Sequence, residues 1–169
     1  MSEQEYLRDR TWSDRYLSTI KNIVGPLLLQ PAPLEIDIRE GTDLMVLKAR
    51  DMRIACRVRR PGYAENYGNE FTIRSRRFDT SLPTELQKLY EGFGDWLFYG
   101  HAEPTHEPVL GRWFIVDLAA WRFHLDHSQH QIRWDTQING DHRTAFVWFD
   151  VTSFPPTPAI LVAQGGASC

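Results

Sequence analysis

The stretch GTDLMVLKARDMRIACRVRR, residues 41–60, decides the fold. Its first half, 43–49, is apolar on both faces after Asp43, as expected of a strand that is covered on both sides. Its second half, 53–60, alternates apolar residues with arginines, which is the period of a half-buried strand. Arg50-Asp51 lies between the halves, so we predict two neighbouring strands joined by a hairpin turn.

The sequence on either side predicts a mixed α/β domain with one central sheet. Upstream, an apolar stripe over residues 11–25 indicates an amphipathic helix, and 34–39 alternates like a strand. The predicted downstream elements are strands 70–75, 95–99 and 112–116, helices beginning at Ser81 and at Asp117, and a C-terminal hairpin of 131–136 and 144–151 around Asn139-Gly140. We therefore expect one domain over residues 1–152 and a flexible C-terminal tail over residues 153–169, which are rich in proline and then glycine.

Composition limits the class of protein. With 169 residues, 42% hydrophobic and 24% charged, the chain resembles one globular domain. No apolar run approaches the ~20 residues that span a bilayer, so no membrane association is expected. The first ten residues are strongly charged, and two cysteines make no disulfide framework. A cytoplasmic protein without a secretory signal is the prediction.

The charge is unevenly distributed along the chain. The net charge is −3, yet residues 50–77 carry eight arginines against three acidic residues, a local excess of +5. Arginine suits bidentate contacts with phosphate or carboxylate groups. Two interpretations stay open: a solvated face, or a DNA-binding surface. The residues predicted for that surface are Arg53, Arg57, Arg59, Arg60, Arg74 and Arg76, with Tyr63 and Tyr67 in the adjacent loop.

Residues 12–125 resemble the PD-(D/E)XK nuclease superfamily, the restriction-endonuclease-like proteins, in the order and pattern of their elements. In that family an aspartate opens one strand, and the next strand carries an acid, one residue and a lysine. Asp43 matches the aspartate, and Arg57 and Arg59 stand at the acid and lysine positions. The resemblance implies a central mixed sheet flanked by helices, Mg²⁺-dependent hydrolysis of DNA phosphodiesters, and a homodimer as one option.

The arginines depart from that pattern at the site itself. A guanidinium group has no lone pair to offer Mg²⁺, so Arg57 cannot act as a ligand. The first hypothesis is that the acid has moved: Glu70, or else Glu35 or Asp37, completes the metal site with Asp43. Arg57 and Arg59 would then contact phosphate groups of the substrate.

Two further hypotheses require no metal. In one, Arg57 pairs with Asp43, its charge replaces that of the metal, and the fold binds DNA without cutting it. In the other, the arginine-rich face binds a protein partner, as an inhibitor or adaptor does. Separately, His124, His127 and His130 are spaced by three, which suggests either a zinc site or a helix end where histidine suits the dipole.

Overall fold

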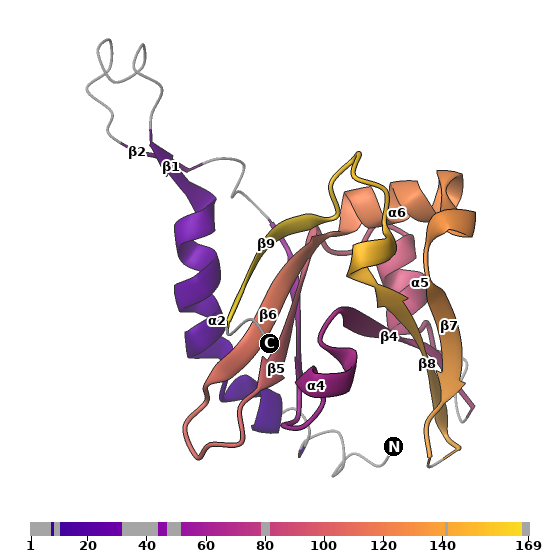
Figure 1. Ribbon diagram of the computed structural model, residues 1–169, viewed down its shortest axis with the longest axis horizontal. Coiled ribbons are helices and arrows are strands. Elements are labelled where there is room, and N and C mark those ends of the chain that lie inside the picture. The colour runs from indigo at the N-terminus through magenta and orange to yellow at the C-terminus, as the bar shows by residue number, and fades with distance from the viewer. Residues whose placement is uncertain are drawn as a thin grey trace.

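The computed structural model describes residues 8, 11–31, 44–46, 52–78, 82–140 and 142–166. The protein is an α/β structure of mixed and antiparallel sheets flanked by helices (Figure 1). Its helices are α2 (Leu17–Val24), α4 (Ala64–Tyr67), α5 (Glu85–Tyr90) and α6 (Leu118–His127), with 3₁₀ turns η1 (Gly25–Leu28), η2 (Gln129–Gln131) and η3 (Val151–Ser153). Its strands are β1 (Leu29–Pro31), β2 (Leu44–Val46), β3 (Ile54–Arg59), β4 (Glu70–Arg77), β5 (Trp96–Ala102), β6 (Leu110–Asp117), β7 (Trp134–Ile138), β8 (Thr144–Asp150) and β9 (Leu161–Gly166).

The main sheet has the strand order β3-β5-β6-β9. β3 runs parallel to β5, and the other two pairings are antiparallel. The predicted hairpin between residues 43–49 and 53–60 is wrong over the described residues, because β2 pairs with β1 and β3 pairs with β5. β5 is the better partner for β3, since its residues from Leu97 to Ala102 are all buried and the two strands stay in register over six residues.

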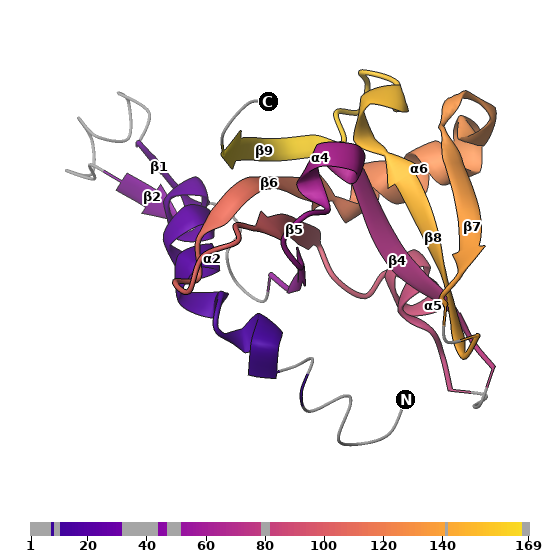
Figure 2. The same ribbon diagram turned by 60° about the horizontal axis from the view of Figure 1, so that its bottom comes forward.

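A second sheet, of order β4-β8-β7, is antiparallel throughout and packs against the main sheet (Figure 2). Alternate residues of β4 and β8 enter the shared core, as the period-two pattern requires. The largest buried side chains of this core are Phe71, Ile73, Leu97, Tyr99, Phe114, Trp121 and Phe149. The predicted strands at 70–75 and 95–99 and the predicted C-terminal hairpin are thus confirmed, with β7 beginning at Trp134 rather than Gln131.

α2 covers the outer face of the main sheet (Figure 1). Tyr16, Ile20 and Val24 are buried there against a second cluster of sheet residues, as the apolar stripe predicts. The helix is shorter than predicted, because residues 11–14 form a separate helical turn and 15–16 a turn before α2 begins.

α5 precedes the start of β5 and α6 follows the end of β6, so both helices lie at one end of the main sheet. α4 follows the last residue of β3, at the other end of this sheet. Asp117 caps α6 as predicted, since its carboxylate accepts from the backbone N–H groups of Ala119 and Ala120. α5 begins at Glu85, four residues later than Ser81, because Thr84 and Gln87 form a capping box at its start. No helix in the described ranges has the length and apolar character needed to cross a membrane.

The predicted flexible tail is wrong for residues 153–166. Phe154 and Ile160 are buried in the core, and β9 pairs with β6 at the edge of the main sheet. Gly165 and Gly166 are needed in β9 because neighbouring groups of β6 lie too close to leave room for a side chain; they do not mark a mobile segment. Gly166 has a φ of +101°, and a Cβ atom on it would lie 2.0 Å from the carbonyl oxygen of Gly111.

Candidate nucleic-acid interface

A row of basic side chains crosses the main sheet at the end near α4. Arg59 of β3 is in register with His101 of β5, and His101 is in register with Arg112 of β6. Register partners on neighbouring strands project to the same face, with strands about 5 Å apart. Arg59, His101 and Arg112 therefore form one cross-strand set, which we call the basic row. Tyr99 and Phe114 lie on the same face of these strands, two residues further into the core.

His101 forms the floor of the basic row. Its side chain is 1% exposed, it contacts the Tyr99 ring edge-on at 5.6 Å, and among the described residues its Nδ1 atom has no hydrogen-bond partner. Burial, and then the charges of Arg59 and Arg112, lower its pKa to about 4. His101 is thus neutral at pH 7, and the charge of the row is that of its two guanidinium groups.

Both arginines are positioned by neutral groups. The guanidinium of Arg59 lies 4.2 Å from the ring centroid of Tyr63, and that of Arg112 donates a hydrogen bond to Asn69 Oδ1. Across the described ranges, no carboxylate forms an ion pair with either guanidinium. Among the described residues, both guanidinium groups therefore keep a positive charge that no carboxylate neutralises.

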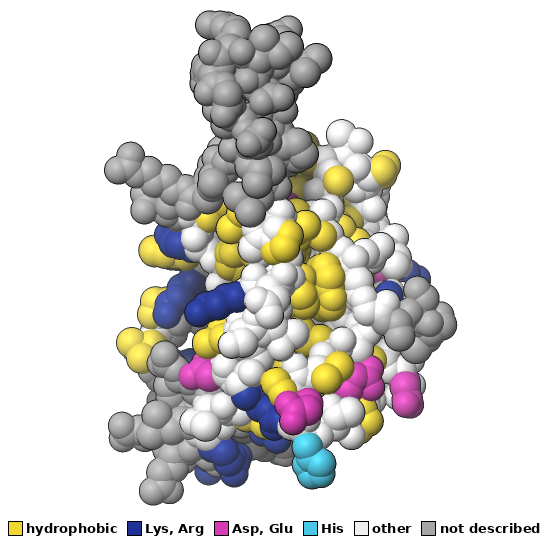
Figure 3. Space-filling view, turned by 90° about the vertical axis from the view of Figure 1, so that its left-hand side faces the viewer, with side chains coloured by type: hydrophobic (Ala, Val, Ile, Leu, Met, Phe, Trp, Pro, Cys, Tyr) yellow, Lys and Arg dark blue, Asp and Glu magenta, His cyan; other side chains and the backbone are white. Residues whose placement is uncertain are grey.

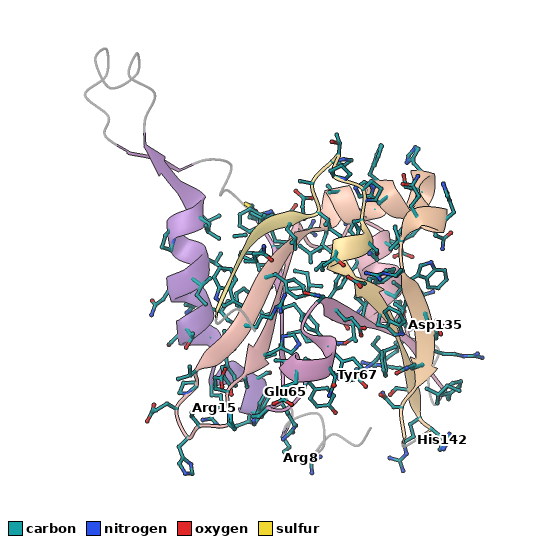
Figure 4. The ribbon with its side chains drawn as sticks, in the orientation of Figure 1. Arg8, Arg15, Glu65, Tyr67, Asp135 and His142 are labelled. Atoms are coloured by element: carbon teal, nitrogen blue, oxygen red, sulfur yellow. The ribbon has the colours of Figure 1, made fainter. Side chains whose placement is uncertain are left out.

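α4 brings two tyrosines to the basic row. Tyr63 and Tyr67 are 39% and 49% exposed, with ring centroids 6.2 Å apart. Gly68 permits the close approach of Arg112, because a Cβ atom there would lie 2.6 Å from the Ala64 carbonyl oxygen and 3.1 Å from Arg112 Nη1. Figure 4 places Tyr67 and the acidic Glu65 on α4, and Asp135 and His142 on the separate β7–β8 hairpin.

Arg53 and Arg60 do not join the basic row. Arg53 precedes Arg59 by six positions, roughly 20 Å along a strand. It forms an ion pair with Asp95 at 3.8 Å. Arg60 lies over the Trp12 ring on the α2 side of the sheet. On that side, Lys and Arg side chains are interspersed with hydrophobic and acidic ones rather than gathered in one patch (Figure 3).

Arg74 and Arg76 lie in the second sheet, away from the basic row and from Arg53 and Arg60. They lie in the second half of β4, which runs from Glu70 near α4 toward the turn of the β7–β8 hairpin, and Arg76 stacks on Phe78 at its end. The arginines of the predicted DNA-binding surface thus lie at separate places in the structure. Arg59 lies over the ring of Tyr63, which is 6.2 Å from that of Tyr67.

The guanidinium group of Arg57 forms an ion pair and hydrogen bonds within the protein. Its Nη2 atom lies 2.5 Å from Glu85 Oε2, and its Nη1 atom donates to the Thr72 carbonyl oxygen at 2.8 Å. Glu85 Oε2 also accepts from the backbone N–H of Arg74 at 3.1 Å. β4 is an edge strand, and these two backbone groups are those that a further strand would bond. The Arg57–Glu85 pair thus completes the β4 edge in place of a strand.

Glu70, the predicted displaced acid, faces Asp150 across the β4–β8 register. Burial and the charge of Asp150 raise the pKa of Glu70. Asp150 in turn forms an ion pair with Arg133 at 2.6 Å and accepts from the backbone N–H of Thr152. Asp43, Glu35 and Asp37 lie outside the described residues.

The described carboxylates do not fit a Mg²⁺ site, because no three His, Cys, Asp or Glu side chains converge there. For the histidines spaced by three, the described residues show no group that could hold zinc, whereas His124 and His127 lie in the last turn of α6, as the helix-end alternative predicts. Buried His124 bonds the Pro158 carbonyl oxygen through Nε2, and His127 stacks on Phe123 at 4.4 Å.

His101 and Arg112 were not among the residues predicted from sequence. His101 follows the predicted strand 95–99 by two residues, and Arg112 is the first residue of the predicted strand 112–116. Nothing in the local pattern indicates that strand pairing brings these two residues to Arg59. No protein-family model matches this chain, and no curated protein and no solved structure is detectably similar to it.

Proposed function

We propose that the protein binds DNA by its phosphate backbone at the basic row. The observation that carries this proposal is the pair of guanidinium groups, Arg59 and Arg112, on either side of neutral His101 and without a carboxylate partner among the described residues. Guanidinium groups so placed can hold the oxygens of one phosphate or of two successive ones. The exposed tyrosines of α4 border the same place.

We further propose that the fold is restriction-endonuclease-like and has lost or displaced the metal site. What supports this assignment is a mixed sheet covered by α2, in which β5 runs parallel to β3 after the chain has passed through β4 and α5; β4 itself belongs to the second sheet. The position that holds an acid in that family carries Arg57, whose guanidinium is paired with Glu85. The basic row remains as a means of holding the nucleic acid.

A protein-binding module with an arginine-rich face has less support. Such a module needs its charges on one surface, whereas Arg53 and Arg57 are paired with Asp95 and Glu85, and Arg76 stacks on Phe78. DNA requires only the local concentration of charge that the basic row supplies.

Fluorescence anisotropy with labelled DNA at low salt tests the proposal. Arg59→Ala and Arg112→Ala should each weaken binding about tenfold, because each removes a charge-assisted contact to phosphate. Each should also reduce the slope of log Kobs against log salt concentration by about one unit. The matched control is Lys88→Ala, an exposed charge on α5. Equal affinities of all three variants would refute the basic row as the site.

Plasmid cleavage with MgCl₂ or MnCl₂ tests the nuclease alternative. DNA binding without nicking is the expected result, because the described acids do not assemble a metal site. Metal-dependent nicking that disappears in Asp43→Ala and in Glu70→Gln would replace the binding proposal with a phosphodiesterase.

A further inference from the structure

We infer that the basic row and the α4 tyrosines together take single-stranded DNA in preference to duplex. The inference rests on the proposed DNA binding and adds the form of the DNA. Three observations carry it: the small number of charges in the basic row, the exposed tyrosine side chains beside them, and the contact that links the two.

Among the described residues, the charge that the basic row supplies is small for a duplex site. Duplex-binding proteins commonly neutralise six to ten phosphates. Here the basic row supplies Arg59 and Arg112, while Arg57 and Arg53 are paired with acids and Arg76 lies at the far end of β4. Two phosphate contacts give weak binding by themselves, so the remaining affinity must come from contacts that carry no charge.

The tyrosines offer that contact. Tyr63 and Tyr67 are one helical turn apart on α4, so both rings lie on the same side of the helix. Their exposed fractions, 39% and 49%, are large for aromatic rings, and nearly half of Tyr67 is in water. Stacking of a base on an aromatic side chain stabilises single-strand complexes in a way that tolerates any sequence.

Arg59 links the two halves of the site. Its guanidinium lies 4.2 Å from the centroid of the Tyr63 ring, so a phosphate held by Arg59 is next to the α4 tyrosines. A single strand can turn its bases toward these rings while its phosphates stay on the basic row. In a duplex each base face is already stacked on its neighbours, and exposing one costs a few kcal/mol.

The test compares a labelled oligo-dT strand with a duplex of the same length, by anisotropy at one low salt concentration. The single strand should bind at least tenfold more tightly. Tyr67→Ala should weaken single-strand binding about tenfold and leave the salt slope unchanged, whereas Tyr67→Phe should bind like the parent. Tyr90→Ala is the matched control, since Tyr90 is 50% exposed on α5.

The outcomes separate this inference from the proposed function. Duplex binding as tight as single-strand binding, or a Tyr67→Ala variant no weaker than Tyr90→Ala, would overturn the inference while DNA binding stands. Absence of binding to either probe at low salt would overturn both. Circular dichroism of each variant shows that the fold is retained.

Discussion

Replacing Arg57 by alanine is expected to lower the free energy of unfolding by about 2–3 kcal/mol. The substitution leaves the Glu85 carboxylate, whose side chain is 30% exposed, without its cation, and it leaves the Thr72 carbonyl oxygen without a donor. Partial exposure keeps the loss below that of a fully buried pair. Urea denaturation at pH 7, followed by tryptophan fluorescence, measures the change.

Arg53→Ala is the control for this experiment. Arg53 and Asp95 form an ion pair whose side chains are 58% and 45% exposed, and such pairs contribute about 0–1 kcal/mol. A double-mutant cycle of Arg57→Ala and Glu85→Ala should give a clear coupling energy, because the two side chains act on one strand edge. If Arg57→Ala costs no more than Arg53→Ala, the edge-completing role of the pair is wrong.

The Arg57–Glu85 pair also bears on the pairing that the sequence suggested for Arg57. One hypothesis from the sequence pairs Arg57 with Asp43, in place of a metal. Asp43 lies outside the described residues, and among those that the structure describes Arg57 contacts the carboxylate of Glu85, at the first turn of α5. The backbone groups that the Arg57 and Glu85 side chains bond belong to β4. Arg57 and Glu85 therefore protect an exposed strand edge, which is a common need of open sheets.

Local pattern predicted much of the secondary structure. β4, β5 and β6 follow from short runs of aromatic and β-branched residues, the Asp117 cap from a lone acid before an apolar stretch, and the β7–β8 turn from Asn139-Gly140. Each of these depends on interactions within a few residues, which is why the sequence alone shows them.

The candidate site depends on pairing between distant segments. His101 reaches Arg59 because β3 and β5, more than 35 residues apart in the chain, pair in parallel, and one residue of slip would turn His101 to the α2 face. Composition was misleading for β9. Its Gly165 and Gly166 leave room for the Trp113 ring and the Gly111 carbonyl group. Neither contact can be predicted from the residues near these glycines in the sequence.

Lowering the pH from 6.5 to 4 is expected to remove about 3 kcal/mol of stability through His101 alone. Its pKa is about 4 in the folded protein and near 6.5 in the unfolded chain, so between these values the unfolded state binds the additional proton. Stability from this group is therefore complete above pH 6.5 and is lost as the pH falls. Urea titrations of the parent and of His101→Phe at half-unit steps measure the effect.

The two curves must diverge for the prediction to hold. His101→Phe removes the titrating group and should lose less stability on acidification, with the gap growing toward pH 4. Glu70 acts in the opposite sense: its raised pKa makes the folded state take up the proton first, but it does so in both proteins and cancels in the difference. Arg112→Ala removes one of the two charges that lower the pKa of His101. In the Arg112→Ala background, the stability difference between the proteins with His101 and with His101→Phe should therefore grow less as the pH falls. Parallel curves for the parent and His101→Phe would show that burial and the charges of Arg59 and Arg112 do not hold His101 neutral.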